Sequence, residues 1–162
     1  MTEITYKKLF EFLEEKRLVT FVVLLLKFST LFIYVTYPLF LLGLYVIKSN
    51  RLAVLILVPF ISFILVTIFR NIKNAKRPYE VYGFKPLLNK DSLGKSFPSR
   101  HTFSAFVIAT SILSINLPIG ATLLLLGVII AISRVVLGLH FIKDVVFGAV
   151  FGIVSGVVCF II

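Results

Sequence analysis

Charged residues and cysteines are scarce in this 162-residue chain. Only 15% of its residues are charged, 59% are hydrophobic, and the mean hydropathy is +1.08. Soluble domains are about 25% charged and about 45–50% apolar, so this composition excludes a water-soluble globular fold and a disordered chain. The one cysteine, Cys159, lies in the last apolar run, which excludes a disulfide framework and a cysteine-based metal site.

Acidic residues are also few, and the charge is strongly one-sided. The chain has 17 Lys and Arg against 7 Asp and Glu, which gives a net charge of +10. The basic residues stand between long apolar runs. This pattern excludes a nucleic-acid-binding domain and predicts a basic membrane protein that faces anionic lipid or an anionic substrate.

Long apolar runs make up most of the sequence: Leu18–Ile47, Leu52–Phe69, Thr102–Ser133 and Val145–Ile162. A membrane-spanning helix needs about 20 mainly apolar residues, so the first, second and fourth runs each predict one span. The third run is too long for one span and has a turn-forming Asn-Leu-Pro-Ile-Gly sequence at 116–120, which predicts two antiparallel helices. We therefore expect a single domain over residues 1–162 with an all-α fold, a polytopic membrane bundle of about five transmembrane helices.

The two polar segments have different predicted roles. In residues 1–17, Tyr6, Leu9, Phe10 and Leu13 follow helical spacing, which predicts an amphipathic interfacial helix; a frayed terminus is the alternative. Residues 70–100 are broken by prolines and glycines and end directly before an apolar run. A polar segment of this length is usually functional or disordered, and we expect it to be the active-site loop.

The two histidines, His101 and His140, lie at the polar ends of apolar runs. The chain between them is expected to cross the membrane and return, so both belong on one side of the bilayer. Asp144 follows His140 by four residues, which on helical geometry places both on one face within hydrogen-bonding reach. A carboxylate so placed can fix the tautomer of the imidazole. A histidine that merely snorkels or caps a helix is the alternative, which two such histidines make weaker.

Four arginines belong on the same side as the histidines: Arg70, Arg77, Arg100 and Arg134. Guanidinium groups that repel one another need an anion, and they match phosphate oxygens well. Ser99 fits equally a helix N-cap or a phosphate ligand. The sequence offers no carboxylate cluster for Mg²⁺ or Ca²⁺ and no Cys/His set for zinc. We therefore expect no cofactor and no metal, and a phosphoryl transfer with histidine as nucleophile.

These residues form three linked motifs: Arg70-x6-Arg77-Pro78, Pro98-Ser99-Arg100-His101, and Ser133-Arg134-x5-His140-x3-Asp144. In order and spacing they resemble the signature of the type 2 phosphatidic acid phosphatase superfamily, which includes lipid phosphate phosphatases, glucose-6-phosphatase and vanadium haloperoxidases. The resemblance covers residues 70–144, about half of the chain.

The resemblance implies a role for each matched residue. His140 is similar to the nucleophile that forms a phosphohistidine, and Asp144 to the residue that orients it. His101 matches the general acid that protonates the leaving oxygen. The implied phosphate ligands are Arg70, Arg77, Ser99, Arg100 and Arg134.

Two positions depart from the family pattern. Arg70 stands where the family commonly has Lys, which keeps the charge but changes the geometry. Arg100 replaces a usual Gly, whose backbone N–H helps to bind phosphate. A side chain at a position with positive φ would be strained, so we expect backbone strain at Arg100.

The predicted function is hydrolysis of a terminal phosphate from a phospholipid or a polyprenyl phosphate or diphosphate. The predicted partner is thus a lipid phosphate in the bilayer, with no nucleic acid; the sequence leaves the oligomeric state open. The alternative is a non-catalytic channel or lipid-binding protein that holds anions in the same basic pocket. A His–Asp pair favours catalysis, because anion binding alone does not need one.

The expected location is a multi-pass protein of the bacterial plasma membrane, and two arguments disagree about the side of the site. Five spans place residues 1–17, the 70–100 loop and residues 134–144 on one side, with most of the basic residues; Lys48 and Arg51 lie on the other. The positive-inside rule then favours a cytoplasmic site. The resemblance implies the outer face.

Overall fold

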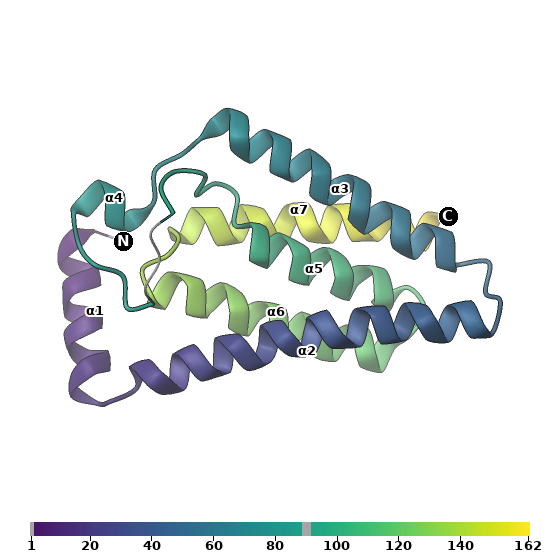
Figure 1. Ribbon diagram of the computed structural model, residues 1–162, viewed down its shortest axis with the longest axis horizontal. Coiled ribbons are helices and arrows are strands. Elements are labelled where there is room, and N and C mark those ends of the chain that lie inside the picture. Colours follow the sequence, from purple (N-terminus) through teal and green to yellow (C-terminus); the bar gives the residue numbers. More distant parts are fainter. Residues whose placement is uncertain (1, 89–91) are drawn as a thin grey trace.

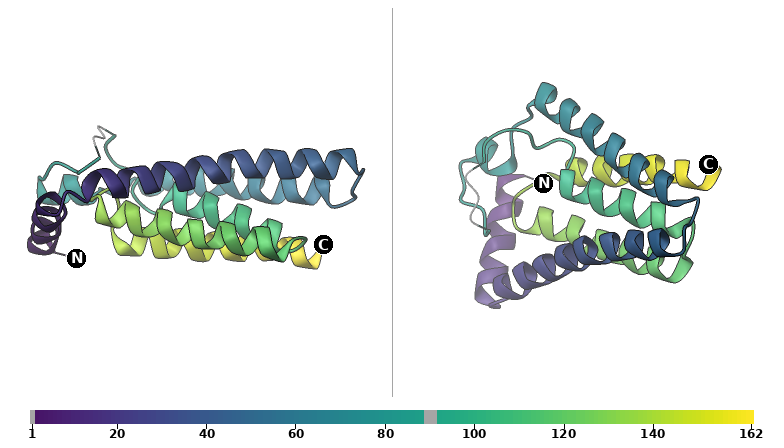
Figure 2. Two further views of the ribbon diagram at one scale, coloured as in Figure 1. Left: turned by 90° about the horizontal axis from the view of Figure 1, so that it is seen from below. Right: turned by 45° about the vertical axis from the view of Figure 1, so that its right-hand side comes forward.

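The computed structural model describes residues 2–88 and 92–162 and is helical, with no strand among those residues. Five long helices form a bundle whose axes run roughly along the same direction (Figures 1 and 2). They are α2 (Val19–Val46), α3 (Leu52–Lys73), α5 (Arg100–Leu113), α6 (Leu117–Val136) and α7 (Ile142–Ile161). Two shorter helices, α1 (Glu3–Glu15) and α4 (Pro78–Tyr82), lie at one end. The predicted all-α bundle of about five long helices preceded by an amphipathic helix is confirmed.

Four of these helices, α2, α3, α6 and α7, are long and apolar enough to cross a membrane. The chain is therefore a multi-pass membrane protein. Helix α5 differs from the expectation, because its 14 residues extend only about 21 Å at 1.5 Å per residue, less than a hydrocarbon core of about 30 Å. Most of α5 is buried between its neighbours. It is thus the central helix of the bundle.

The turn predicted inside the third apolar run separates α5 from α6. Asn116 is the N-cap of α6, and its side-chain oxygen accepts a hydrogen bond from the backbone N–H of Ile119 at 3.0 Å. Pro118 follows in the first turn of the helix, where its missing N–H costs nothing. The two antiparallel helices expected from this run are confirmed.

Helices α5 and α7 pack closely against each other, which brings the second and third motifs together. Along α7, Gly148, Gly152 and Gly156 recur every four residues and face α5. A Cβ atom at Gly152 would lie 2.7 Å from the carbonyl oxygen of Phe103, and one at Gly148 would lie 2.7 Å from that of Ser99. The missing side chains therefore allow the first turns of α5 and α7 to lie side by side.

Helix α1 lies across the end of the bundle at which α4 and the 70–100 loop also lie (Figures 1 and 2). Thr2 caps its N-terminus, with its side chain accepting from Thr5 N. Of the predicted apolar stripe, Tyr6 and Leu13 are buried, and Leu9 and Phe10 are half-buried. The amphipathic helix is therefore packed on the protein, and the alternative of a frayed terminus is wrong. Residues 89–91 of the predicted loop lie outside the described part of the chain.

The arrangement gives a test of membrane orientation. The 70–100 loop and the α2–α3 turn lie at opposite ends of the bundle (Figure 1). Leu93 is 74% exposed at the first end, and Asn50 is exposed at the second. In a Cys159→Ser background, we expect an impermeant maleimide on intact cells to label Asn50→Cys and not Leu93→Cys, because the basic residues at the loop end favour the cytoplasm. The reverse labelling would place the loop outside the cell, as the family resemblance implies.

Candidate active site

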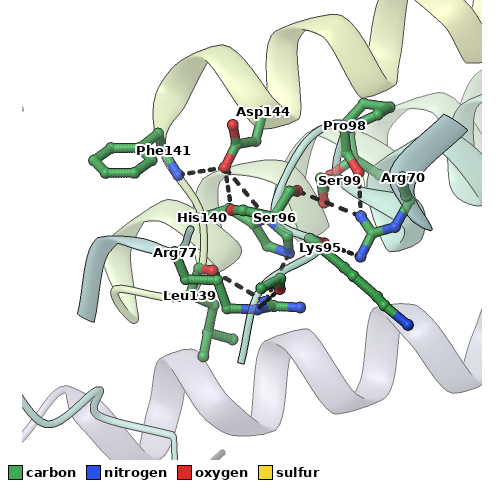
Figure 3. A network of polar contacts seen from close by, with 12 residues as sticks. Arg70, Arg77, Lys95, Ser96, Pro98, Ser99, Leu139, His140, Phe141 and Asp144 are labelled. Atoms are coloured by element: carbon green, nitrogen blue, oxygen red, sulfur yellow. Dashed lines mark hydrogen bonds and ion pairs between the residues drawn. The ribbon is translucent and has the colours of Figure 1, made fainter. Parts of the chain in front are cut away.

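Four segments meet at the end of the bundle that α1 covers. They are the C-terminal part of α3, the residues before α4, the stretch 95–99 before α5, and the turn 137–141 that leads into α7 (Figure 3). Each carries residues of the three motifs identified in the sequence. The motifs, separated by tens of residues along the chain, are thus neighbours in space.

His140 and Asp144 form a buried pair at the centre of this region. Each is 1% exposed, and His140 Nδ1 lies 3.5 Å from Asp144 Oδ2. The prediction that they pair holds, but its helical reason was wrong. His140 precedes α7, whose N-cap is Phe141. Asp144 is in the first turn and accepts a hydrogen bond from Phe141 N at 3.0 Å, so the capping geometry of α7 turns the carboxylate toward the imidazole.

Ser96 is a third member of this network and was not predicted from the sequence. It is fully buried, and its Oγ lies 2.5 Å from Asp144 Oδ2 and 3.3 Å from His140 Nδ1 (Figure 3). The spacing of the motifs gives no signal for it, because Ser96 is one of several serines in a polar loop. Its role arises from the loop path, which a backbone hydrogen bond from Ser96 N to Ala75 O at 2.8 Å helps to set.

Arg77 lies on the opposite edge of the imidazole. Its Nη1 is 3.4 Å from His140 Nε2, and the same nitrogen donates to Leu139 O at 3.2 Å. An arginine can only donate, so Nε2 is the acceptor and the neutral ring carries its proton on Nδ1, facing Asp144. The unprotonated nitrogen of His140 is therefore directed toward a cation.

Arg77 itself is held by the loop and by α4. Its Nε donates to Gly94 O at 3.0 Å. Its backbone N–H donates to Glu80 Oε1 at 3.0 Å, and the same oxygen accepts from Gly94 N at 2.7 Å. Glu80 therefore holds the backbone of Arg77 next to Gly94, whose carbonyl oxygen accepts from the guanidinium.

Arg70 has a different environment from the one expected of a phosphate ligand. It is buried, and its guanidinium donates to the carbonyl oxygens of Lys95, Ser96 and Pro98 (Figure 3). These contacts hold the stretch that carries Ser96 and Ser99. In this structure Arg70 acts on the loop, and the planar fork of guanidinium donors explains why Arg can replace the usual Lys here.

Ser99 is the N-cap residue of α5, but its side chain does not cap the helix. Its Oγ accepts from Thr102 Oγ1 at 3.0 Å, and its backbone N–H donates to the carbonyl oxygen of Asp144 at 2.8 Å. The capping alternative for the hydroxyl is therefore wrong. The backbone contact joins the second motif to the third.

Arg134 is buried on α6, and its backbone carbonyl accepts from His140 N at 3.2 Å. Within the described residues, its Nε has no hydrogen-bond partner. The residue is thus tied to His140 through the backbone, while its side chain keeps a buried donor for another acceptor.

Arg100 and His101 lie on the first turn of α5, and Arg100 is close enough for its charge to act on Arg77. Together with Tyr34, Phe63 and Ser104 they line a hollow of about 160 Å³. Arg100 is exposed and stacks on the Phe63 ring at 5.6 Å from its centre. Its backbone is helical and is not among the positive-φ positions, so the expected strain at Arg100 was wrong. Replacement of Gly is tolerated here because the position belongs to a regular helix.

Burial determines the charge state of His140. It lowers the pKa of the imidazole from 6.5 to about 4; the hydrogen bond to Asp144 opposes this shift, and the positive charge of Arg77 reinforces it. His140 is therefore a neutral base at physiological pH.

The site and the bundle together define a class: a multi-pass helical membrane protein with a buried His–Asp pair beside arginines, suited to phosphate esters. Comparison with known proteins gives the family, because residues 51–162 match the family model of the PAP2 superfamily. The chain therefore belongs to the PAP2 superfamily, which confirms the family that its three motifs resemble.

Individual relatives agree with this assignment. The chain is 32% identical over 116 residues to the bacitracin transport permease protein BcrC of Bacillus licheniformis, a match that covers 69% of this chain and 56% of that protein. The crystal structure of Aquifex aeolicus LpxE superposes with a TM-score of 0.70 at 32% identity, covering 88% of this chain and 84% of that one. A phosphatidylglycerolphosphate phosphatase from Bacillus subtilis shares the fold, with a TM-score of 0.58 at 22% identity over 96% and 90% of the two chains.

The charge state of His140 can be measured directly, because the chain has only two histidines. In an NMR titration with labelled histidine, we expect the signal that disappears in His140→Gln to stay at its neutral position between about pH 8 and pH 5.5, given a pKa of about 4. The unfolded chain binds a proton near pH 6.5 and the folded one near 4, so the free energy of unfolding should fall as the pH is lowered through this window. A His140 signal that titrates near pH 6.5 would contradict this environment.

Proposed function

We propose that this protein is a membrane lipid phosphate phosphatase that works through a phosphohistidine intermediate and without a metal ion. The carrying observation is the orientation of His140, with Nδ1 toward Asp144 and Ser96 and Nε2 toward Arg77. This arrangement supplies an unprotonated nitrogen next to a group that attracts phosphate. We propose the bacterial plasma membrane as its location.

In the proposed reaction, a bond forms between His140 Nε2 and phosphorus as the bond from phosphorus to the lipid oxygen breaks. His101 gives a proton to that oxygen, so the lipid leaves as an alcohol, or as a lipid monophosphate when the substrate is a diphosphate. Water then attacks the phosphohistidine as His101 takes a proton from it, and the bond between Nε2 and phosphorus breaks. Inorganic phosphate and free His140 are released, and His101 is protonated again. Asp144 stabilises the imidazolium that exists during each step.

The buried guanidiniums supply the positive charge that a metal ion supplies in other phosphatases. Arg77 is placed to bind the transferred group, and Arg134 has a buried Nε with no partner within the described part of the chain. We assign phosphate binding to these two residues and to Ser99, with Arg100 contributing from the exposed rim. For Arg70 the contacts with three loop carbonyls favour an indirect contribution.

A groove beside the site supports a lipid substrate. It encloses about 430 Å³ between α2, α3 and α5, and its lining is almost wholly apolar. Tyr34, Phe63 and Ser104 line both this groove and the hollow that contains His101. An acyl or prenyl chain in the groove would therefore place its phosphate-bearing end at His101, where the leaving oxygen needs a proton. A water-soluble anion has no apolar chain that could bind in such a groove.

The proposal is tested by phosphate release from a panel of lipids. Purified protein in detergent should release inorganic phosphate from phosphatidic acid, phosphatidylglycerol phosphate or a polyprenyl phosphate or diphosphate. His140→Ala should lower the rate by a factor of about 1,000 or more, as loss of a nucleophile does. Lys143→Ala, an exposed change in the same segment, is the matched control and should keep a near wild-type rate.

Two additions to this assay test the chemistry. Activity should persist in excess EDTA, and vanadate should inhibit it because vanadate resembles five-coordinate phosphorus. Loss of activity in EDTA that Mg²⁺ restores would contradict a metal-independent reaction. No release from any lipid, with tight binding of the same lipids, would favour the alternative of a non-catalytic anion- or lipid-binding protein.

The position of His101 beside the groove predicts a dependence on the leaving group. A poor leaving group such as a lipid alkoxide needs a proton, whereas p-nitrophenolate needs little help. His101→Asn should therefore lose about 100-fold or more on a lipid monophosphate and much less on p-nitrophenyl phosphate. Equal losses on the two substrates would assign His101 to phosphate binding.

A further inference from the structure

The N-terminal helix reaches the peptide of the proposed nucleophile. Tyr6 on α1 is fully buried, and its hydroxyl donates a hydrogen bond to the carbonyl oxygen of His140 at 3.2 Å. The two residues are 134 positions apart in the sequence. The family model begins at residue 51, so this contact comes from a part of the chain that lies outside the matched region.

Aromatic rings from α1 and from the 70–100 loop pack against the turn that contains His140. The Tyr6 ring centre is 5.1 Å from that of Phe84, and Phe10 packs edge-on to Phe84 at 5.2 Å. Both Phe rings contact Gly138, where an added Cβ atom would lie 2.7 Å from Phe10 and 2.9 Å from Phe84. Gly138 has a φ of +74°, which glycine adopts without strain. Helix α1 therefore packs directly on the turn 137–141.

The other groups of His140 are held from within the matched region. Its Nδ1 faces Asp144, its backbone N–H donates to Arg134 O at 3.2 Å, and the carbonyl of the preceding residue, Leu139, accepts from Arg77. Tyr6 adds the contact to the carbonyl of His140 itself. The backbone N–H and the carbonyl of His140 are thus both hydrogen-bonded, one on each side of its Cα atom. Because the side chain branches from this Cα atom, the direction of the imidazole depends on both hydrogen bonds.

We propose that Tyr6 is a positioning residue for phosphoryl transfer, whose hydroxyl fixes the His140 peptide and thereby aims Nε2 at phosphorus. The inference rests on the proposed function, since it assigns the attack to His140. Tyr6 itself touches neither substrate nor the reacting atoms. Burial raises the pKa of Tyr6 to about 12, so the hydroxyl keeps its proton and remains a donor throughout the working pH range.

The matched pair of variants is Tyr6→Phe and Tyr79→Phe. Each removes one hydroxyl from a buried tyrosine that donates to a backbone carbonyl, and in Tyr79 the acceptor is Ser92 O at 2.5 Å. Both variants keep the ring and its packing. Tyr6→Phe should lower kcat by about 3- to 10-fold, the effect of one lost hydrogen bond on an oriented group, with KM within about twofold of wild type. Tyr79→Phe should leave kcat near the wild-type value.

A second measurement does not depend on activity. In hydrogen–deuterium exchange followed by mass spectrometry, the peptide that contains residues 137–141 should exchange faster in Tyr6→Phe and at the wild-type rate in Tyr79→Phe. Unchanged kcat, a kcat loss equal in the two variants, or unchanged exchange at 137–141 would overturn the inference. A wild-type protein that releases no phosphate from any lipid would overturn the proposed function, and with it the role of Tyr6 in catalysis, whatever the exchange rates show.

Discussion

The site depends on the contacts of Asp144. One oxygen of its carboxylate faces His140 Nδ1 and accepts hydrogen bonds from Ser96 Oγ and from the backbone N–H of Phe141. The backbone carbonyl of Asp144 accepts from Ser99 N. A single residue therefore joins the loop before α5, the turn after α6 and the start of α7. These side-chain contacts all reach Oδ2, while the buried Oδ1 has no hydrogen-bond partner within the described residues. The three segments thus meet at one oxygen of a buried carboxylate, whose lost hydration these contacts offset in part.

Two of the arginines, Arg70 and Arg77, already donate to groups of the protein itself. Arg70 is occupied by three loop carbonyls, and Arg77 by two carbonyls and the ring of His140. A cluster of guanidinium groups repels itself, and backbone oxygens offset part of that repulsion before any phosphate binds. The basic region is therefore pre-formed, and less reorganisation is needed when an anion enters.

The sequence predicts the helices of this protein better than the contacts of its site. Apolar runs indicate segments that are buried in the bilayer, so the helical bundle could be predicted from them. The turn at Asn116 could be predicted because it interrupts the longest of these runs. The spacing of His140 and Asp144 predicted their contact, although the contact arises from an N-terminal cap and not from a helical face. Ser96 and Tyr6 could not be identified, because their partners are fixed by how the loop and α1 fold back. The strain expected at Arg100 was wrong because a helix begins at that residue.

The two histidines occupy environments that suit opposite tasks in the proposed reaction. Burial beside Arg77 keeps His140 neutral, and the same positive charge that disfavours its protonation attracts the phosphate it would attack. The imidazolium would become favourable only once the anion is present, so attack and binding reinforce each other. His101 is half-buried at the edge of an apolar groove, where a lipid leaving group would emerge. Placement of the nucleophile in the turn before α7 and of the acid on α5 therefore follows the path of the substrate, from the charged end to the apolar chain.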